Sequence, residues 1–357
     1  MAPLGGRLGR TALLALGGAA LMTGMWAGLQ RLGLVSGGPA VAVQHGPLMV
    51  SGFLGTVLSL ERAVALGKNW AAVVPAMAGL GAVALIAGHP DLGLLAASAA
   101  GLGLVALFVI LSRREPAPHM AVMGLGAVSW LAGSAALLAG QPMAVAAWLW
   151  AGFLVLTIVG ERMELNRVRR LPRLGTIALG LVVVATVAAL VALPFAPELA
   201  GRALGACLLG AAVWLLTFDV ARRTVRSRGL TRFVAVCLLS GFLWLGVAGL
   251  LLLVHGLQYV GLLYDAQLHA VFVGFVLAMI FGHAPVVFPA VLMLPLRYRP
   301  VAYLPLWVLH GALIARVAGD LLGEPSLRVA GSVGNVVAIL LFVVLQMFSA
   351  LSGRTKG

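Results

Sequence analysis

The sequence contains very little charge and almost no cysteine. Only 10% of its 357 residues are charged, and it has 24 basic side chains, 10 acidic side chains and two cysteines. Cys207 and Cys237 lie inside apolar runs, without a Cys-x-x-Cys or Cys/His ligand spacing. This pattern argues against a disulfide framework and a zinc site, and it indicates that both cysteines are packing residues.

Long polar segments are also missing, so no separate soluble domain is expected. No nucleophile motif, phosphate-binding loop or dinucleotide fingerprint follows a segment with strand character. A hydrolase or a nucleotide-dependent enzyme is therefore not expected. Any chemistry should take place among the apolar segments themselves.

Hydrophobic residues make up 62% of the chain, and its mean hydropathy is +1.09. Apolar runs of about twenty residues recur throughout, and a run of this length can cross a bilayer as a helix. The sequence predicts an all-α, polytopic bundle, organised as a single integral membrane domain over residues 1–357. The twelve predicted spans are 11–34, 41–66, 69–88, 92–112, 119–140, 143–161, 174–195, 199–221, 230–256, 262–291, 301–322 and 327–351.

The net charge of +14 would suggest a nucleic-acid partner in a soluble protein. Here the basic residues occupy short loops between apolar runs, so they indicate topology, with the lipid bilayer as partner and no nucleic acid. Twelve spans put all but four of the 24 basic residues on one side; the exceptions are Arg31, Arg202, Arg316 and Arg328. The positive-inside rule then predicts a multi-pass protein of a bacterial-type inner membrane with both termini in the cytoplasm.

Small residues are abundant, and the 46 glycines favour close helix approach in a lipid phase. A weak repeat accompanies them, because a Gly-Phe pair recurs in the second, sixth and tenth predicted spans, with a polar residue nine positions after each glycine. The pairs are Gly52-Phe53, Gly152-Phe153 and Gly274-Phe275, followed by Glu61, Glu161 and His283. A threefold repeat and chance are both open explanations.

Two histidines, His45 and His269, lie near the same predicted face of the second and tenth spans. An imidazole in hydrocarbon needs a partner, since burying its nitrogens unpaired costs on the order of 1–3 kcal/mol. Two such histidines at similar depth could hold both axial positions of one haem iron. The alternative is two unrelated histidines that hydrogen-bond to backbone carbonyls.

The remaining histidines allow two interpretations. His255, His283 and His310 could contribute to a second metal site, or they could be ordinary hydrogen-bonded residues. His283 lies about 21 Å of helix beyond His269, so those two cannot share an iron. His89 and His119 flank spans and are expected to be solvated.

Acidic and basic residues meet at the ends of two predicted spans, in Glu61-Arg62 and Glu161-Arg162. They could form interfacial ion pairs that anchor the helix ends. They could also provide an entry point for a proton or an ion, because burial of a carboxyl near hydrocarbon raises its pKa.

The histidine motifs resemble a known family. His45-Gly46-x-x-Met49 is similar to the His-Gly-x-x-Met of helix two in the catalytic subunit of haem–copper oxidases, and the segment from His269 to Phe281 is similar to that family's helix ten. The resemblance implies a haem–copper oxidase subunit I-like architecture. It implies His45 and His269 as ligands of a low-spin haem b, and outer-side Arg316 and Arg328 as partners of the haem propionates.

The NnrS-type nitric-oxide-response membrane proteins are similar too, through His269-Ala270, Gly274 and Met279. The sequence departs from both families. Gln267 stands where the oxidases carry the high-spin haem ligand, and residues 145–205 contain no histidine to bind copper. The Thr-Arg tail of the NnrS type is replaced by Gly282-His283-Ala284-Pro285. Neither copper nor oxygen reduction at a haem–copper centre is expected.

The sequence thus favours a membrane haem protein of respiratory or nitric-oxide metabolism. It would be oxidoreductase-like and would respond to a diatomic gas or exchange electrons with a donor protein. The alternative is a secondary transporter or exporter without haem, which twelve spans, glycine-rich packing and intramembrane Glu and His residues would also fit. The His45 and His269 pair discriminates between the two.

Overall fold

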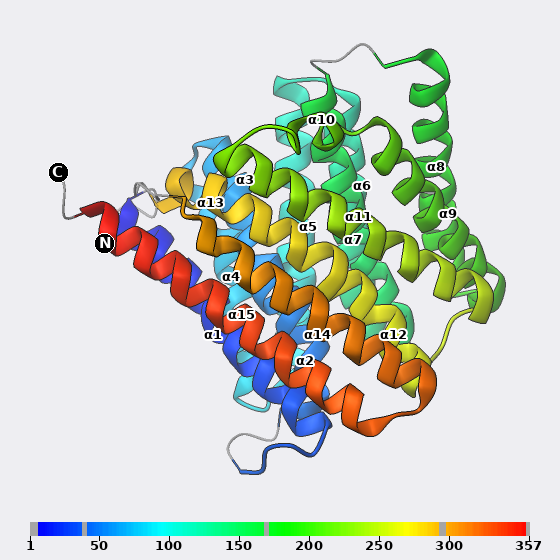
Figure 1. Ribbon diagram of the computed structural model, residues 1–357. Helices are drawn as coiled ribbons and strands as arrows, with labels where there is room; N and C mark the ends of the chain where they lie inside the picture. Colours follow the sequence, from blue (N-terminus) through cyan, green and yellow to red (C-terminus); the bar gives the residue numbers. More distant parts are fainter. Residues whose placement is uncertain (1–5, 38–40, 168–170, 293–297, 355–357) are drawn as a thin grey trace. The chain divides into compact units, whose positions relative to one another are not determined.

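Helices joined by short loops make up the part of the chain that the structure describes. This computed structural model describes residues 6–37, 41–167, 171–292 and 298–354, and no strand occurs among them (Figure 1). Twelve helical segments there are long and apolar enough to cross a membrane. The prediction of an all-α, multi-pass membrane protein is confirmed. Four of the basic residues in the charge argument lie outside the described residues: Arg169, Arg170, Arg297 and Lys356.

The chain divides into two compact units, residues 1–161 and 162–357, where the sequence was interpreted as a single membrane domain. The first unit contains α1 (Arg7–Arg31), η1 (Ala42–Gln44), α2 (His45–Pro47), η2 (Leu48–Leu54), α3 (Gly55–Leu66), η3 (Asn69–Ala72), α4 (Val73–Ile86), α5 (Pro90–Arg114), α6 (Pro118–Leu138) and most of α7 (Met143–Asn166). Its second span is built from the continuous run η1, α2, η2 and α3.

The second unit begins with the last turn of α7. It contains α8 (Arg173–Ala192), α9 (Pro197–Phe218), α10 (Ala221–Thr224), α11 (Gly229–His255), α12 (Leu262–His269), η4 (Ala270–Leu277), α13 (Ala278–Leu292), η5 (Pro300–Ala302), α14 (Tyr303–Leu322) and α15 (Pro325–Arg354). The run α12, η4 and α13 forms the tenth span.

Proline and glycine set many of the helix ends. Among the described elements, four α-helices start on a proline, which needs no hydrogen-bonded N–H in a first turn: α5, α6, α9 and α15. Gly67 and Gly323 close α3 and α14 in the left-handed conformation, with φ of 68° and 69°. These local signals explain why most predicted span boundaries lie within a few residues of the observed ones.

Two spans depart from α-helical geometry. The segments η2 and η4 are π-helical, and they follow His45 and His269 closely. Each contains one of the recurring Gly-Phe pairs, whereas Gly152-Phe153 lies in the regular helix α7. The Gly-Phe recurrence therefore coincides with a shared backbone feature at two of its three places. Single-turn π-helices are rare and occur frequently at functional sites.

Glycines bring helices into close contact in both units. A Cβ at Gly126 of α6 would lie 2.8 Å from the Phe153 carbonyl oxygen of α7, and one at Gly101 of α5 would lie 3.0 Å from Leu131 Cα. In the second unit, a Cβ at Gly249 of α11 would lie 2.8 Å from the Gly205 carbonyl oxygen of α9. The packing role predicted for the glycine-rich stretches is therefore confirmed at these contacts.

Candidate functional site

His45 lies against α1 at the start of the second span. Its Nδ1 is 2.7 Å from the Gly24 carbonyl oxygen, and a Cβ at Gly28 would lie 3.0 Å from the imidazole Cε1. Met49, one turn later, packs on the same helix, since a Cβ at Gly24 would lie 2.8 Å from its sulfur. The two motif residues therefore share one glycine-lined surface of α1.

His269 ends α12 in the second unit. Its Nδ1 is 2.8 Å from the Asp265 carbonyl oxygen and 3.4 Å from the Asp265 carboxylate. A carbonyl oxygen can only accept a hydrogen bond, so Nδ1 carries the proton in both His45 and His269. In the neutral form of either ring the lone pair is then on Nε2, the nitrogen that would bind a metal.

A cluster of ion pairs surrounds Asp265. Arg316 of α14 donates from Nε and Nη2 to its two carboxylate oxygens, over 2.8 and 3.0 Å, and both side chains are about nine-tenths buried, at 11% and 15% exposure. Arg328 of α15 pairs with fully buried Asp320 of α14 over 3.0 Å. We call Asp265, His269, Arg316, Asp320 and Arg328 the Asp265 cluster.

The Asp265 cluster changes how the two arginines are understood. Arg316 and Arg328 were assigned to haem propionates by resemblance, and the structure gives both a carboxylate partner within the second unit. Propionate binding stays a prediction. Asp265 and Asp320 were not among the site residues predicted from the sequence. Their spacing was a usable signal, because Asp265 precedes His269 by four residues and Arg316 precedes Asp320 by four, which puts each pair on one helix face.

His310 lies in a hydrogen-bonded chain that fixes its protonation. The Trp244 indole donates to its Nδ1 over 3.0 Å, and its Nε2 is 2.9 Å from the Ser240 hydroxyl. An indole N–H can only donate, so Nδ1 accepts and Nε2 carries the proton, while the Ser240 hydroxyl donates onward to the Val236 carbonyl. With these bonds in place, neither nitrogen offers a lone pair to a metal.

The other two candidates for a second metal site do not take part in the hydrogen bonds of His310. His283 is anchored through Nδ1 to the Met279 carbonyl oxygen at 2.8 Å, and His255 is exposed at the end of α11. Among the described residues no three His, Cys, Asp or Glu side chains come together as a metal site. The structure therefore places these two histidines and His310 in separate surroundings.

The two histidines that flank predicted spans, His89 and His119, differ in exposure. His89 is exposed, as expected. His119 is only 2% exposed, so the expectation that it is solvated was wrong. It follows Pro118 in the first turn of α6, and a Cβ at Gly160 in α7 would lie 3.0 Å from its carbonyl oxygen, so this turn packs closely on α7.

Glu61, Arg62 and Glu161 meet in the first unit. Arg62 Nη2 donates to Glu161 over 2.6 Å and to Glu61 over 3.0 Å, and its guanidinium lies over the Phe108 ring. These three residues therefore form ion pairs, as one of the two interpretations expected. An entry point for a proton or an ion stays a prediction. Arg162 lies in the second unit, where its Nη1 is 3.9 Å from fully buried Asp219.

Asp219 also explains why α7 runs five residues past its predicted end. Asn166 donates to its carboxylate over 3.2 Å and accepts a hydrogen bond from the Val220 N–H. The second carboxylate oxygen of Asp219 accepts the Ala221 N–H at the start of α10 over 2.7 Å. The helix α7 thus continues beyond its apolar run, because Asn166 finds hydrogen-bond partners there while it is buried.

Comparison with known proteins gives one family. The model of a domain of unknown function, DUF8744, matches residues 10–351. The chain belongs to the DUF8744 family. No curated protein and no solved structure matches the chain. The DUF8744 region covers most of each unit and includes both histidine motifs and the whole Asp265 cluster.

Proposed function

We propose that this DUF8744 protein binds haem in the membrane, with His45 and His269 as the two axial ligands of one low-spin haem b. The observation that carries the proposal is shared by both residues, since each Nδ1 donates to a backbone carbonyl, over 2.7 and 2.8 Å. Metal-ligating histidines almost always donate their second ring nitrogen in this way, which fixes the tautomer and orients the ring.

The surroundings of the two histidines fit such a role. Gly28 leaves space beside the His45 ring, and the carboxylate of Asp265, 3.4 Å from His269 Nδ1, would help to hold the orientation of that ring. Both rings are partly exposed and lie next to π-helical segments, which supports a site over plain packing. A bound haem would supply one-electron redox chemistry or a site for a diatomic gas.

We do not propose oxygen reduction. Gln267, at the position of the oxidases' high-spin ligand, is fully buried, and its amide nitrogen donates to the Gly256 carbonyl over 2.9 Å and to the Leu251 carbonyl over 3.3 Å. This amide ties α12 to the end of α11, which is a structural role. The proposed role is therefore electron transfer, with an electron-donor protein as partner, or a response to a diatomic gas.

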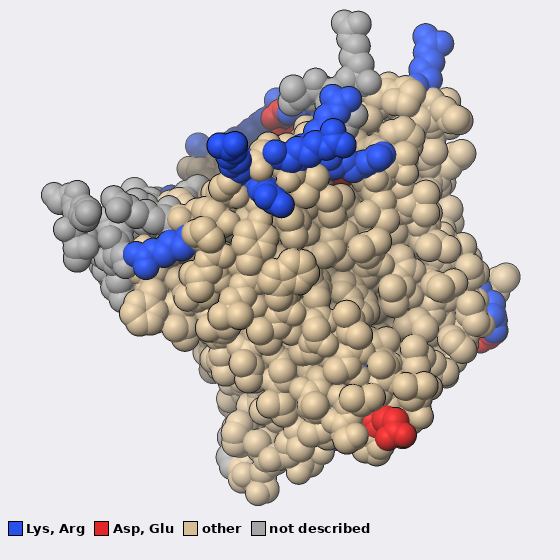
Figure 2. Space-filling model, in the orientation of Figure 1, with Lys and Arg blue, Asp and Glu red and all other residues tan. Residues whose placement is uncertain are grey.

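The proposed setting is a bacterial-type inner membrane with both termini in the cytoplasm. The distribution of basic residues supports it, because Arg173, Arg222, Arg223 and Arg228 all lie at one end of the helices of the second unit. Figure 2 shows Lys and Arg side chains gathered over α10 at this end.

Purification in the presence of haem tests the ligand assignment. The full-length protein in detergent should carry one haem whose reduced spectrum is typical of bis-imidazole ligation, and His45→Ala and His269→Ala should each abolish that spectrum. His89→Ala, which changes an exposed histidine, should leave it unchanged. A colourless protein with full helix content and one size-exclusion peak would contradict the proposal.

A secondary transporter is the second candidate, favoured by the Asp265 cluster. Ionisable residues inside spans are costly and often mark an ion or substrate pathway. This function requires transport by haem-free protein in vesicles and its loss in Asp265→Asn. Haem binding that survives Asp265→Asn and disappears in His45→Ala would exclude this candidate as an explanation of the histidines.

A further inference from the structure

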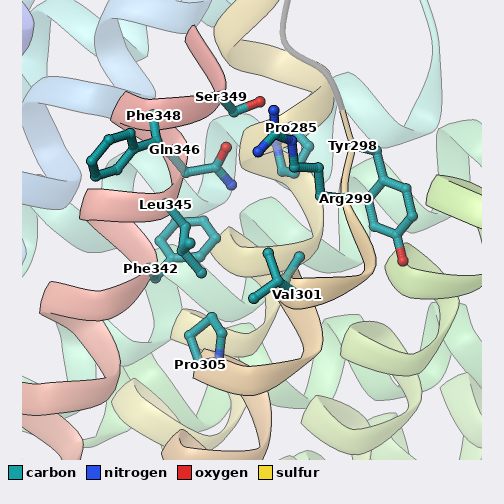
Figure 3. Close-up of a pocket in the computed structure, with 11 residues that line it drawn as sticks. Pro285, Tyr298, Arg299, Val301, Pro305, Phe342, Leu345, Gln346, Phe348 and Ser349 are labelled. Carbon is teal, nitrogen blue, oxygen red and sulfur yellow. The ribbon is translucent and has the colours of Figure 1, made fainter. Parts of the chain in front are cut away.

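A pocket opens between the ends of α13, α14 and α15 in the second unit (Figure 3). It encloses about 550 Å³ of space, part of which is open to the surroundings. Its apolar wall is formed by Pro285, Val301, Pro305, Phe342 and Leu345. Phe342 stacks on Phe281 with ring centroids 4.0 Å apart, which holds this part of the wall in place.

Polar groups gather at one end of the pocket. In Figure 3 the polar ends of Arg299, Gln346 and Ser349 lie at the upper end, and Phe342, Val301 and Pro305 lie below them. Arg299 is exposed, and in the described part of the chain no carboxylate lies in an ion pair with it. The pocket therefore presents a cationic head region above an apolar wall.

Neighbouring residues place this head region at the basic end of the unit. Tyr298, beside Arg299, packs against Phe233 in the first turns of α11, with ring centroids 5.7 Å apart. Burial and the adjacent Tyr303 raise the pKa of Tyr298, so its phenol stays neutral and does not repel an anion. The basic loop that precedes α11 adds positive potential at the same end.

The apolar side of the pocket continues onto surface suited to lipid. Val301 is 44% exposed and Phe348, on the outer side of α15, is 62% exposed. A water-soluble anion would use the cationic end and leave this apolar surface unused. An amphiphile with an anionic headgroup would use both.

We propose that the pocket binds one anionic phospholipid. The phosphate would lie at Arg299, with Gln346 and Ser349 as further polar contacts, and an acyl chain would lie along Phe342 and Leu345. The site is at the opposite end of the tenth span from His269, so this proposal is independent of haem binding.

Native mass spectrometry of the delipidated full-length protein tests the proposal. The protein is titrated with phosphatidylglycerol, and separately with phosphatidylcholine that carries the same acyl chains. Because one basic side chain near an anionic headgroup contributes on the order of fivefold in affinity, phosphatidylglycerol should bind roughly fivefold more tightly. Arg299→Gln should remove this preference, and Arg226→Gln, an equal change of charge at an exposed position in the loop before α11, should retain it.

A variant that fills the pocket and competition by inorganic phosphate complete the test. Val301→Trp should abolish the bound lipid by occupying the pocket, and the position is exposed enough to accept a larger side chain. Equal binding of the two lipids, equal effects of Arg299→Gln and Arg226→Gln, or full binding by Val301→Trp would each overturn the proposal. Displacement of the lipid by millimolar inorganic phosphate would also overturn it, because the site would then be one for free anions.

Discussion

Replacement of Arg316 by glutamine should destabilise the protein strongly, because it removes the bidentate partner of Asp265. The two side chains are 11% and 15% exposed and meet over 2.8 and 3.0 Å. Breaking a buried pair on one side typically costs 3–5 kcal/mol, and the residual exposure places this pair at the lower end, about 3 kcal/mol. Asp265→Asn should cost about 2 kcal/mol, since the long arginine side chain can move its charge toward water.

The double variant Arg316→Gln/Asp265→Asn shows whether the two side chains stabilise the protein as a pair or independently of each other. Asp265→Asn in the Arg316→Gln background removes the uncompensated charge, so the two changes together should cost about 3 kcal/mol or less, a coupling of about 2 kcal/mol. Reversible unfolding in mixed micelles, followed by far-UV ellipticity, measures these energies. Arg167→Gln breaks an exposed pair with Glu164, at 52% and 39% exposure, and serves as the control with a loss below about 1 kcal/mol. Additive losses from the two cluster variants would refute the reasoning.

Two further predictions concern packing and topology. Gly274→Ala should lower the free energy of unfolding by about 1–3 kcal/mol, because the new methyl would overlap Trp244. Gly311→Ala in α14, where a Cβ meets nothing within 4 Å, should leave that free energy unchanged or raise it by about 0.5 kcal/mol, and comparable losses in both variants would disprove the packing argument. Reporter fusions after residue 115 should score as cytoplasmic and those after residue 90 as extracytoplasmic, and the reverse result would invert the proposed orientation.

The twelve spans were predictable from sequence because length and apolar composition decide whether a segment can cross a bilayer. The pairing of Arg62 with Glu161 was accessible as well, since both residues end their apolar runs on one predicted side. Sidedness alone could not identify the partners of Arg316 and Arg328. Those partners, Asp265 and Asp320, lie inside apolar runs, where a single carboxylate hardly changes the hydropathy.

The π-helical segments had no sequence signal that a 3.6-residue period could detect. A helical-wheel argument assumes about 100° per residue, and this assumption fails across Leu48–Leu54 and Ala270–Leu277. Which residues share a face with His45 or His269 beyond these segments therefore had to come from the structure. The partner of His45 Nδ1 also had to come from the structure, because the Gly24 carbonyl belongs to a different span from His45.

The same two segments constrain how members of the DUF8744 family can differ in length. A π-helical turn contains one residue more than the α-helical turn in its place. Loss of one residue from Ala270–Leu277 would restore regular hydrogen bonding and leave the residues after it, including Pro285, close to their orientation around the helix axis. Loss of one residue from a regular α-helical segment would instead rotate everything after it by about 100°. Within the spans, single-residue differences in length should therefore occur in these two short stretches, and other insertions and deletions should fall in the loops between spans.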